Sequence, residues 1–311
     1  MSSMSRVITQ DGQDASIGDG LVASAEAAYR ACNLCGSDKR RSRYFIDGFH
    51  IVECLECDLN YVAERVSEAE LSCYYGEAYY NGGQANGYAD YLAGREAKKA
   101  HYRTLLPSIR HHLHTKSVRA LDVGCAAGFF LEVAQETGWN ARGIELSPYM
   151  SRYAREQRGL EVLTGSLESL DLPKESFNLI TMWDVIEHLA DPAAALRRAY
   201  DLLTPNGIIV IATGDISGAT ARIYRRRWDL LAPPGHLFYF SRKTLFEMLR
   251  RARFQPLAWQ SDGAFLVNGE LGGKLRSAVN RLHRSRYVNA ALRRLKLGSI
   301  MTVYARKCGI N

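Results

Sequence analysis

Short apolar runs alternate with amphipathic segments over the second half of the chain. The run at 118–123 predicts a buried strand, a turn of small residues follows at 124–128, and the segment that starts at Phe129 predicts a helix. A strand, a small-residue turn and a helix form the opening unit of an open α/β nucleotide-binding sheet. The pattern therefore places the fold in the α/β class.

The alternation continues towards the end of the chain. Asp191 and Pro192 suit the N-cap and the first turn of a helix, which is predicted over 193–203. Ser241 can cap a second helix, predicted over 245–253. Further strands are predicted at 208–212, 254–261 and 299–306. The pattern therefore predicts a sheet of several strands.

Two Cys-x-x-Cys pairs, Cys32 with Cys35 and Cys54 with Cys57, stand eighteen residues apart in the first part of the chain. This spacing predicts four thiolates around Zn²⁺ in a zinc ribbon at 29–66, with strands at 44–46 and 50–53. Four protein ligands leave no open position on the metal, so we expect the zinc to be structural. A redox-active dithiol or disulfide pair is the alternative.

Length and charge narrow the class of protein further. The 311 residues suffice for a full-sized core and an accessory module, and the net charge is +7. Basic residues gather at 222–227 and 274–296, which predicts an anionic partner such as a phosphate, a pyrophosphate or a lipid headgroup, or alternatively a solvated surface.

No apolar run approaches the roughly 18–20 residues of a membrane span. Residues 1–28 are small and polar and lack the pattern of a signal peptide, so we expect a flexible tail. The sequence predicts a cytoplasmic protein.

The turn at 124–128 excludes a dinucleotide fingerprint. That fingerprint would need glycine where Ala126 and Phe129 stand. Glu145 ends the next predicted strand, where a carboxylate can accept two hydrogen bonds from a ribose diol. The pattern indicates a nucleoside ligand that is neither NAD nor FAD.

Four motifs follow one another over about a hundred residues. They are 122–128 with 143–145, then 165–168, then 177–188, and finally 202–207 with the strand 208–212. In this order they resemble the class I S-adenosylmethionine-dependent methyltransferases. Two positions depart from that pattern, Ala126 in place of glycine and Asn178 in place of aspartate.

The resemblance implies a Rossmann-like seven-stranded sheet over 117–308, preceded by the zinc ribbon and by a tyrosine-rich helical lead at 67–116. It implies S-adenosylmethionine as the cofactor. The cofactor-binding residues that it implies are Asp122, Gly124, Cys125, Ala126, Gly128, Glu145, Leu146, Ser166, Leu167, Trp183 and Asp184.

A general base is useful when the methyl acceptor is a hydroxyl or a carbon acid. His188 is the first candidate, because it follows the predicted fourth strand, where the family places acceptor-side residues. Glu187 could orient it or hold the start of a helix, and His236 is a second base or a substrate ligand. Alternatively, His188 caps a helix and His236 makes a hydrogen bond that structures its loop.

The stretch 214–240 shows no clear element, and a loop of that length inside a domain is usually functional. Related enzymes hold acceptors there, and helices before the first strand cover part of the pocket. A helical pattern is predicted from 88 to 114 within the lead. The candidate substrate-binding residues are Tyr79, Tyr80, Arg226, Trp228 and Tyr239.

A zinc ribbon before a class I core resembles the sugar methyltransferases of deoxysugar and surface-polysaccharide pathways. We therefore expect a small-molecule acceptor, methylated on a hydroxyl or a carbon of a sugar, a glycolipid or a secondary metabolite. The alternatives are a methyltransferase of RNA or protein and a binding module with a dead site. Against nucleic acid, the basic stretches lack regularly interleaved aromatic residues.

The basic segment 268–296 is predicted to be helical. It could rest on a membrane surface, form a dimer contact or serve as a crossover helix. The sequence does not indicate the oligomeric state.

Overall fold

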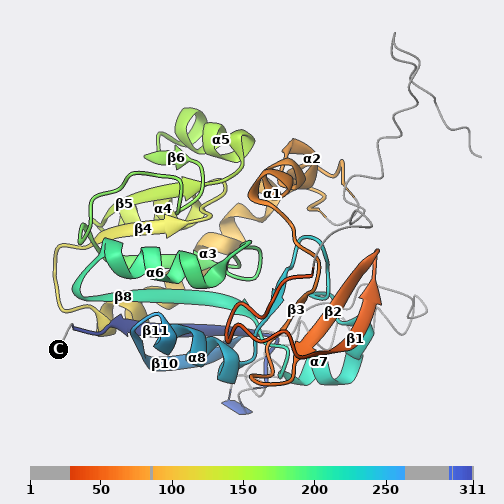
Figure 1. Ribbon diagram of the computed structural model, residues 1–311. Helices are drawn as coiled ribbons and strands as arrows, with labels where there is room; N and C mark the ends of the chain where they lie inside the picture. The colour runs from red at the N-terminus through yellow and green to blue at the C-terminus, as the bar shows by residue number, and fades with distance from the viewer. Residues whose placement is uncertain (1–28, 85–86, 263–293, 296, 310–311) are drawn as a thin grey trace, which may run out of the picture.

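A seven-stranded sheet in the order β10-β11-β8-β7-β4-β5-β6 forms the centre of the computed structural model, which describes residues 29–84, 87–262, 294–295 and 297–309 (Figure 1). The parallel strands are β4 (Arg119–Val123), β5 (Asn140–Glu145), β6 (Val162–Thr164), β7 (Phe177–Trp183) and β8 (Leu203–Gly214). β11 (Ile300–Lys307) runs antiparallel to both β8 and β10 (Phe254–Asp262). The predicted Rossmann-like sheet is confirmed.

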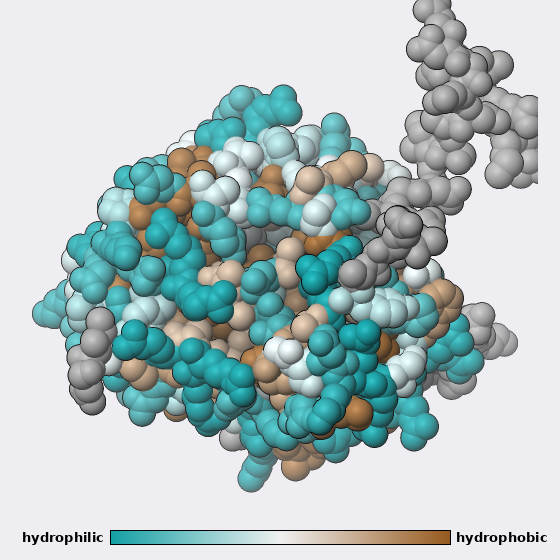
Figure 2. Space-filling view, viewed as in Figure 1, coloured by the Kyte–Doolittle hydropathy of each residue, from teal (hydrophilic) through white to brown (hydrophobic). Residues whose placement is uncertain are grey.

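Helices cover both faces of this sheet. They are α3 (Arg95–His112), α4 (Phe129–Glu136), α5 (Pro148–Arg158), α6 (Pro192–Leu202) and α8 (Arg242–Arg251). Successive residues of β8 face opposite ways, so Val210 packs with α3 and α4, whereas Ile209 and Ile211 pack with α6 and α8. The apolar side chains thereby lie between layers, and the outer face in Figure 2 is mainly hydrophilic.

Two helix starts confirm their sequence predictions. Asp191 accepts a hydrogen bond from the backbone N–H of Ala194 at the start of α6, over 2.8 Å. Ser241 accepts one from the N–H of Thr244 at the start of α8, over 3.3 Å. In both cases a side chain satisfies an N–H that the helix itself leaves unpaired.

A second sheet has the strand order β1-β2-β3-β9 and lies at the right of Figure 1. Its strands β1 (Arg40–Ile46), β2 (Phe49–Cys54) and β3 (Asn60–Val62) fall within the predicted zinc ribbon. The fourth strand, β9 (Phe238–Tyr239), comes from much later in the chain and pairs antiparallel with β3. The ribbon therefore shares a sheet with a loop of the core.

The segment between ribbon and core is helical, as predicted, but its elements differ in detail. It contains α1 (Glu68–Tyr74), α2 (Glu77–Tyr80), a 3-10 helix η1 (Leu92–Gly94) and α3. The helix expected from 88 therefore begins a few residues later. Ser67 and Glu70 form a reciprocal capping box at α1, which stabilises so short a helix.

The prediction that 214–240 has no regular element was wrong. It holds α7 (Ala219–Tyr224), the 3-10 helix η2 (Arg225–Arg227) and β9. α7 has six residues and no side-chain N-cap, and β9 has two residues that form a strand by pairing with β3. Elements this short leave no periodic pattern in the sequence.

Two predicted segments lie outside the described residues: the tail at 1–28, and the basic segment 268–296 apart from two of its residues. None of the helices in the described part of the chain combines the length and apolar character that crossing a bilayer requires.

Candidate active site

A cavity of about 350 Å³ lies at the carboxyl ends of β4, β5 and β7. Ligands of open α/β sheets bind at this edge. The cavity lining includes most of the residues predicted for the cofactor and for catalysis. These are Gly124, Ala126, Glu145, Leu146, Ser166, Leu167, Trp183, Asp184, Glu187, His188 and His236.

Gly124 gives the turn after β4 its shape, because Val185 leaves no room for a side chain at this position. Its φ is +67°, and a Cβ there would lie 2.5 Å from Cγ2 of Val185. Ala126 also has a positive φ, +46°. The turn therefore presents backbone to the cavity next to the N-terminus of α4, where a nucleoside ligand can approach closely.

Substitution of Gly124 by alanine is expected to weaken binding of S-adenosylhomocysteine about tenfold, because the new Cβ must displace the turn or Val185. Calorimetric titration measures this. Gly138→Ala is the matched control, since Gly138 has a φ of +77° and open space around its Cβ position. Equal affinities for the two variants would contradict the role of the turn.

Three of the predicted cofactor residues shape the turn and do not line the cavity. Asp122 is buried and accepts a hydrogen bond from the hydroxyl of Thr181 over 2.6 Å. The thiol of Cys125 packs against Gly143, and the N–H of Gly128 donates to the carbonyl of Cys125 over 2.8 Å. Their contacts hold the turn in place.

Glu145 ends β5 and is 5 % exposed. Its two carboxylate oxygens accept hydrogen bonds from the N–H groups of Ala126 and Ser147, each over 2.7 Å. Burial raises the pKa of this carboxyl group, although the backbone N–H donors oppose the shift. A carboxylate fixed by backbone at the strand end is suited to accept hydrogen bonds from ribose hydroxyls.

His188 follows β7, and its orientation is fixed by two partners. Nδ1 lies 2.7 Å from the carbonyl oxygen of Gly235 and 2.8 Å from the hydroxyl of Tyr75, which itself donates to the same carbonyl over 2.9 Å. Because a carbonyl only accepts, the ring proton belongs on Nδ1. Burial lowers the pKa of His188, which leaves a neutral ring with a lone pair on Nε2.

Acidic groups and a second histidine surround this ring. The rings of His188 and His236 lie 4.6 Å apart at 84°. Desolvation among the cavity walls raises the pKa of Asp184 to about 6, and burial raises that of Glu187 to about 7. No hydrogen bond of the described residues joins the Glu187 carboxylate to the His188 ring, so Tyr75 and Gly235 orient the base instead.

Glu187 Oε2 is buried and has no hydrogen-bond partner among the described residues. The donor atoms of Glu187, His188 and His236 lie within 4.8 Å of one another. This set of one carboxylate and two imidazoles is of a type that also binds divalent metal ions.

Six tyrosines from the helical lead line one side of the cavity: Tyr75, Tyr79, Tyr80, Tyr88, Tyr91 and Tyr102. Many of their rings meet edge to face, as Tyr75 and Tyr79 do with centroids 4.9 Å apart. The ammonium group of Lys98 lies 3.8 Å from the ring centre of Tyr91, and burial lowers its pKa to about 8. Tyr79 and Tyr80 thus reach the cavity. Tyr75 and Lys98 are lining residues that the sequence did not single out.

Three candidate substrate residues lie away from the cavity lining. Arg226 is exposed in η2, and Trp228 is buried near Gly214. Tyr239 lies in β9 and donates from its hydroxyl to the carbonyl of His236 over 3.0 Å. The sequence did not reveal the short elements α7, η2 and β9, which place these three side chains outside the cavity lining.

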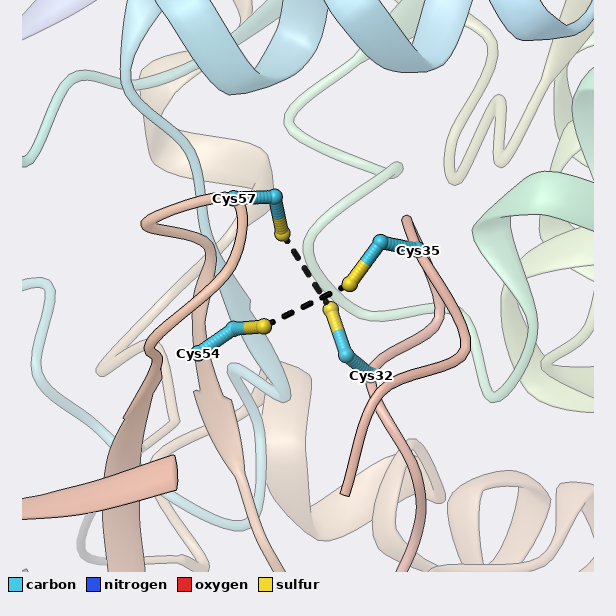
Figure 3. Close-up of side chains that lie close together, drawn as sticks. All are labelled: Cys32, Cys35, Cys54 and Cys57. Carbon is cyan, nitrogen blue, oxygen red and sulfur yellow. Dashed lines mark hydrogen bonds between the residues drawn. The ribbon is translucent and has the colours of Figure 1, made fainter. Parts of the chain in front are cut away.

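The four cysteines of the ribbon point towards one another (Figure 3). Sγ of Cys32 lies 3.5 Å from Sγ of Cys57, and Sγ of Cys35 lies 3.4 Å from Sγ of Cys54. Tetrahedral zinc with Zn–S bonds of about 2.3 Å places sulfurs about 3.8 Å apart. The backbone at 34–35 and 56–57 donates hydrogen bonds to the sulfurs of Cys32 and Cys54. The residues present fit a zinc ion.

The fold and the cavity define an α/β enzyme with a nucleoside-binding edge. A family model described as a methyltransferase domain matches residues 91–258, which is more than half of the chain. The chain belongs to this family and is a class I S-adenosylmethionine-dependent methyltransferase.

Curated relatives and a solved structure agree with this assignment. The ubiquinone biosynthesis O-methyltransferase of Ruegeria pomeroyi is 29% identical over 49% of this chain and 71% of its own length. That of Azorhizobium caulinodans is 31% identical over 51% and 72%. A chain from the complex of the Haloferax volcanii Trm112 methyltransferase activator with a methyltransferase has a TM-score of 0.51 at 16% identity, covering 70% of this chain and 95% of that one. The last likeness shows the fold.

Proposed function

We propose that this enzyme methylates a hydroxyl group of a small molecule and that His188 is the general base. The observation that carries the proposal is the Nδ1 contact with Gly235, which places the ring proton on Nδ1 and the lone pair on Nε2, in the same cavity as the cofactor residues. The names of the curated relatives, ubiquinone biosynthesis O-methyltransferases, support oxygen as the methylated atom.

In this proposal, separate groups of residues bind the cofactor, shield the acceptor and remove its proton. S-adenosylmethionine supplies an electrophilic methyl group. The turn at Gly124 and the Glu145 carboxylate bind the nucleoside half of the cofactor, and the tyrosines exclude water from the acceptor side. His188 Nε2 would take the proton from the acceptor hydroxyl, and the bound cofactor would supply the methyl group that the acceptor oxygen gains and would leave as the neutral thioether.

The acceptor that we propose is a sugar, a glycolipid or a secondary metabolite. The tyrosine lining supports this class, because tyrosine rings offer apolar faces to a ring or chain while their hydroxyls can bind polar groups. The experiment is to add methyl-labelled cofactor and the enzyme to host lysate and to count separate fractions. Label in the lipid or small-molecule fraction supports this acceptor class. Label in RNA or protein overturns it and would make the ribbon a docking module.

Metal-assisted methyl transfer is the second candidate, and the convergence of Glu187, His188 and His236 favours it. A divalent ion held there would acidify the acceptor hydroxyl. Dialysis against a chelator that leaves the cysteine-bound zinc in place separates the two candidates. Retained activity supports His188 as a simple base, and activity that is lost and restored by added metal supports the second candidate.

We further propose that the ribbon cysteines hold one structural zinc ion, because their mutual distances fit tetrahedral coordination. Mass spectrometry under native conditions is expected to find one zinc per chain, and about a tenth of that or less in Cys54→Ser. Cys73→Ser is the control, because Cys73 is an exposed cysteine outside the cluster. Equal zinc contents in the two variants would contradict the assignment.

A further inference from the structure

The first cysteine turn of the ribbon is hydrogen-bonded to the loop that carries His188. Asn33 lies between the ligand candidates Cys32 and Cys35. Its Nδ2 donates to the carboxylate of Asp191 over 2.9 Å, and its Oδ1 accepts from the N–H of Ala193 over 3.0 Å. A side chain from the ribbon therefore completes the N-terminal cap of α6, some 160 residues later in the chain.

Neighbouring ribbon residues hold the same loop from two further sides. Arg30 donates to the carbonyl of Ala190 over 3.2 Å, and its guanidinium lies 5.3 Å from the ring centre of Phe238. At the start of β9, the N–H groups of Leu237, which precedes the strand, and of Phe238 donate to the carbonyl of Glu187 over 2.8 and 3.1 Å. Since β9 pairs with β3, the ribbon reaches both ends of 187–191.

These contacts fall on one half of the cavity. Glu187, His188, Leu189, Ala190 and Asp191 all line it on the side of the proposed base. In contrast, no hydrogen bond or ion pair of the described residues joins the ribbon to 119–167, which contains the glycine turn and Glu145. The ribbon can therefore act on the acceptor half and leave the cofactor half unchanged.

We propose that Asn33 is a positioning residue, through which the metal-bound cysteine turn fixes the loop 187–191 on the acceptor side of the cavity. This inference rests on the proposed function, in particular on zinc in the ribbon and on His188 beside the acceptor. The amide is suited to the task because it donates to a carboxylate and accepts from a backbone N–H at once. Metal loss releases the turn, and the loop then loses these two bonds.

The test compares backbone hydrogen exchange in the full-length protein and in Asn33→Ala. Peptides covering 185–196 are expected to exchange about tenfold faster in the variant, because two hydrogen bonds that hold the segment are gone. Exchange over 119–145, the zinc content and the affinity for S-adenosylhomocysteine are expected to stay within about twofold of the parent. Ser37→Ala is the matched control, since within the described chain the hydroxyl of Ser37 accepts a hydrogen bond from the N–H of Lys39 inside the ribbon.

A spectroscopic readout separates positioning from a general loss of stability. The ring Cε1–H resonance of His188, assigned by its absence in His188→Gln, is expected to shift in Asn33→Ala, and that of the distant His112 is not. Asn33→Asp keeps the acceptor for Ala193 but sets a carboxylate against that of Asp191, so its effect should be at least as large as that of Asn33→Ala. Removal of zinc by a chelator is expected to reproduce the shift in His188 while S-adenosylhomocysteine still binds.

Two results would overturn the inference. One is an unchanged exchange rate over 185–196 in Asn33→Ala; the other is an equal increase over 119–145, which indicates general destabilisation. Failure of the parent to bind S-adenosylhomocysteine or to contain zinc would instead contradict the proposed function. Ligand affinity and zinc content are measured separately from hydrogen exchange, so the two kinds of failure can be told apart.

Discussion

Replacement of His188 by glutamine is expected to lower the rate of methyl transfer by about 100- to 10,000-fold, the usual contribution of a positioned general base. Glutamine can still donate to the carbonyl of Gly235, so the loop should keep its shape. It cannot take a proton from the acceptor. S-adenosylhomocysteine should bind to the variant with nearly the parent's affinity, because the residues of the cofactor half are untouched.

The dependence of the rate on pH gives a second readout of the same step. Burial lowers the pKa of His188, so the neutral, competent ring predominates at pH 7. The rate should rise with pH through an apparent pKa below 6.5, and this rise should vanish in His188→Gln. His112→Gln, at the end of α3 and far from the cavity lining, is the control. Full activity in His188→Gln would remove His188 from the mechanism.

Features of the site that depend on a few consecutive residues could be predicted from the sequence. The turn at 124–128 is one, because strand, small residues and helix follow directly. The N-cap at Asp191 and the position of Glu145 at the end of β5 are others. The two cysteine pairs could also be predicted from the sequence, because the spacing of the ligands within each pair is a local property. The structure places all of these as the sequence indicated.

Contacts between distant segments could not be predicted in this way. Tyr75 meets His188 across 113 residues, and its sequence context is that of any packed tyrosine. The strand β9 has no pattern of its own and exists through its pairing with β3, which also removes Tyr239 from the cavity lining. Tyr239 was predicted as a substrate residue from its place in the stretch 214–240, and in the structure it pairs with β3 outside the cavity lining.

The second large effect is expected at Glu145. Glu145→Gln should weaken binding of S-adenosylhomocysteine about 100-fold, because hydrogen bonds from the two ribose hydroxyls to a carboxylate are each worth about 1.5–3 kcal/mol. The amide also turns an NH₂ group towards a backbone N–H of Ala126 or Ser147, where the carboxylate offered an acceptor. Calorimetric titration measures the affinity, with Glu161→Gln, a substitution of an exposed glutamate, as the control.

Lowering the pH should also weaken the binding of S-adenosylhomocysteine to the parent protein. Burial raises the pKa of Glu145 above its ordinary 4.5, so as the pH falls, protonation removes an acceptor earlier than in an exposed glutamate. Affinity should therefore be full above this raised pKa and should fall below it, and Glu145→Gln should lack this dependence.

A 2′,3′-dideoxy analogue of S-adenosylhomocysteine distinguishes recognition of the ribose from damage to the turn. If Glu145 binds the hydroxyls, the parent and the variant should bind the analogue with similar affinity, since the lost partners are already absent. An analogue that still binds the parent about 100-fold more tightly than the variant would show that Glu145 acts only by holding the N–H groups of Ala126 and Ser147. The nucleoside half of the cofactor would then depend on the glycine turn alone.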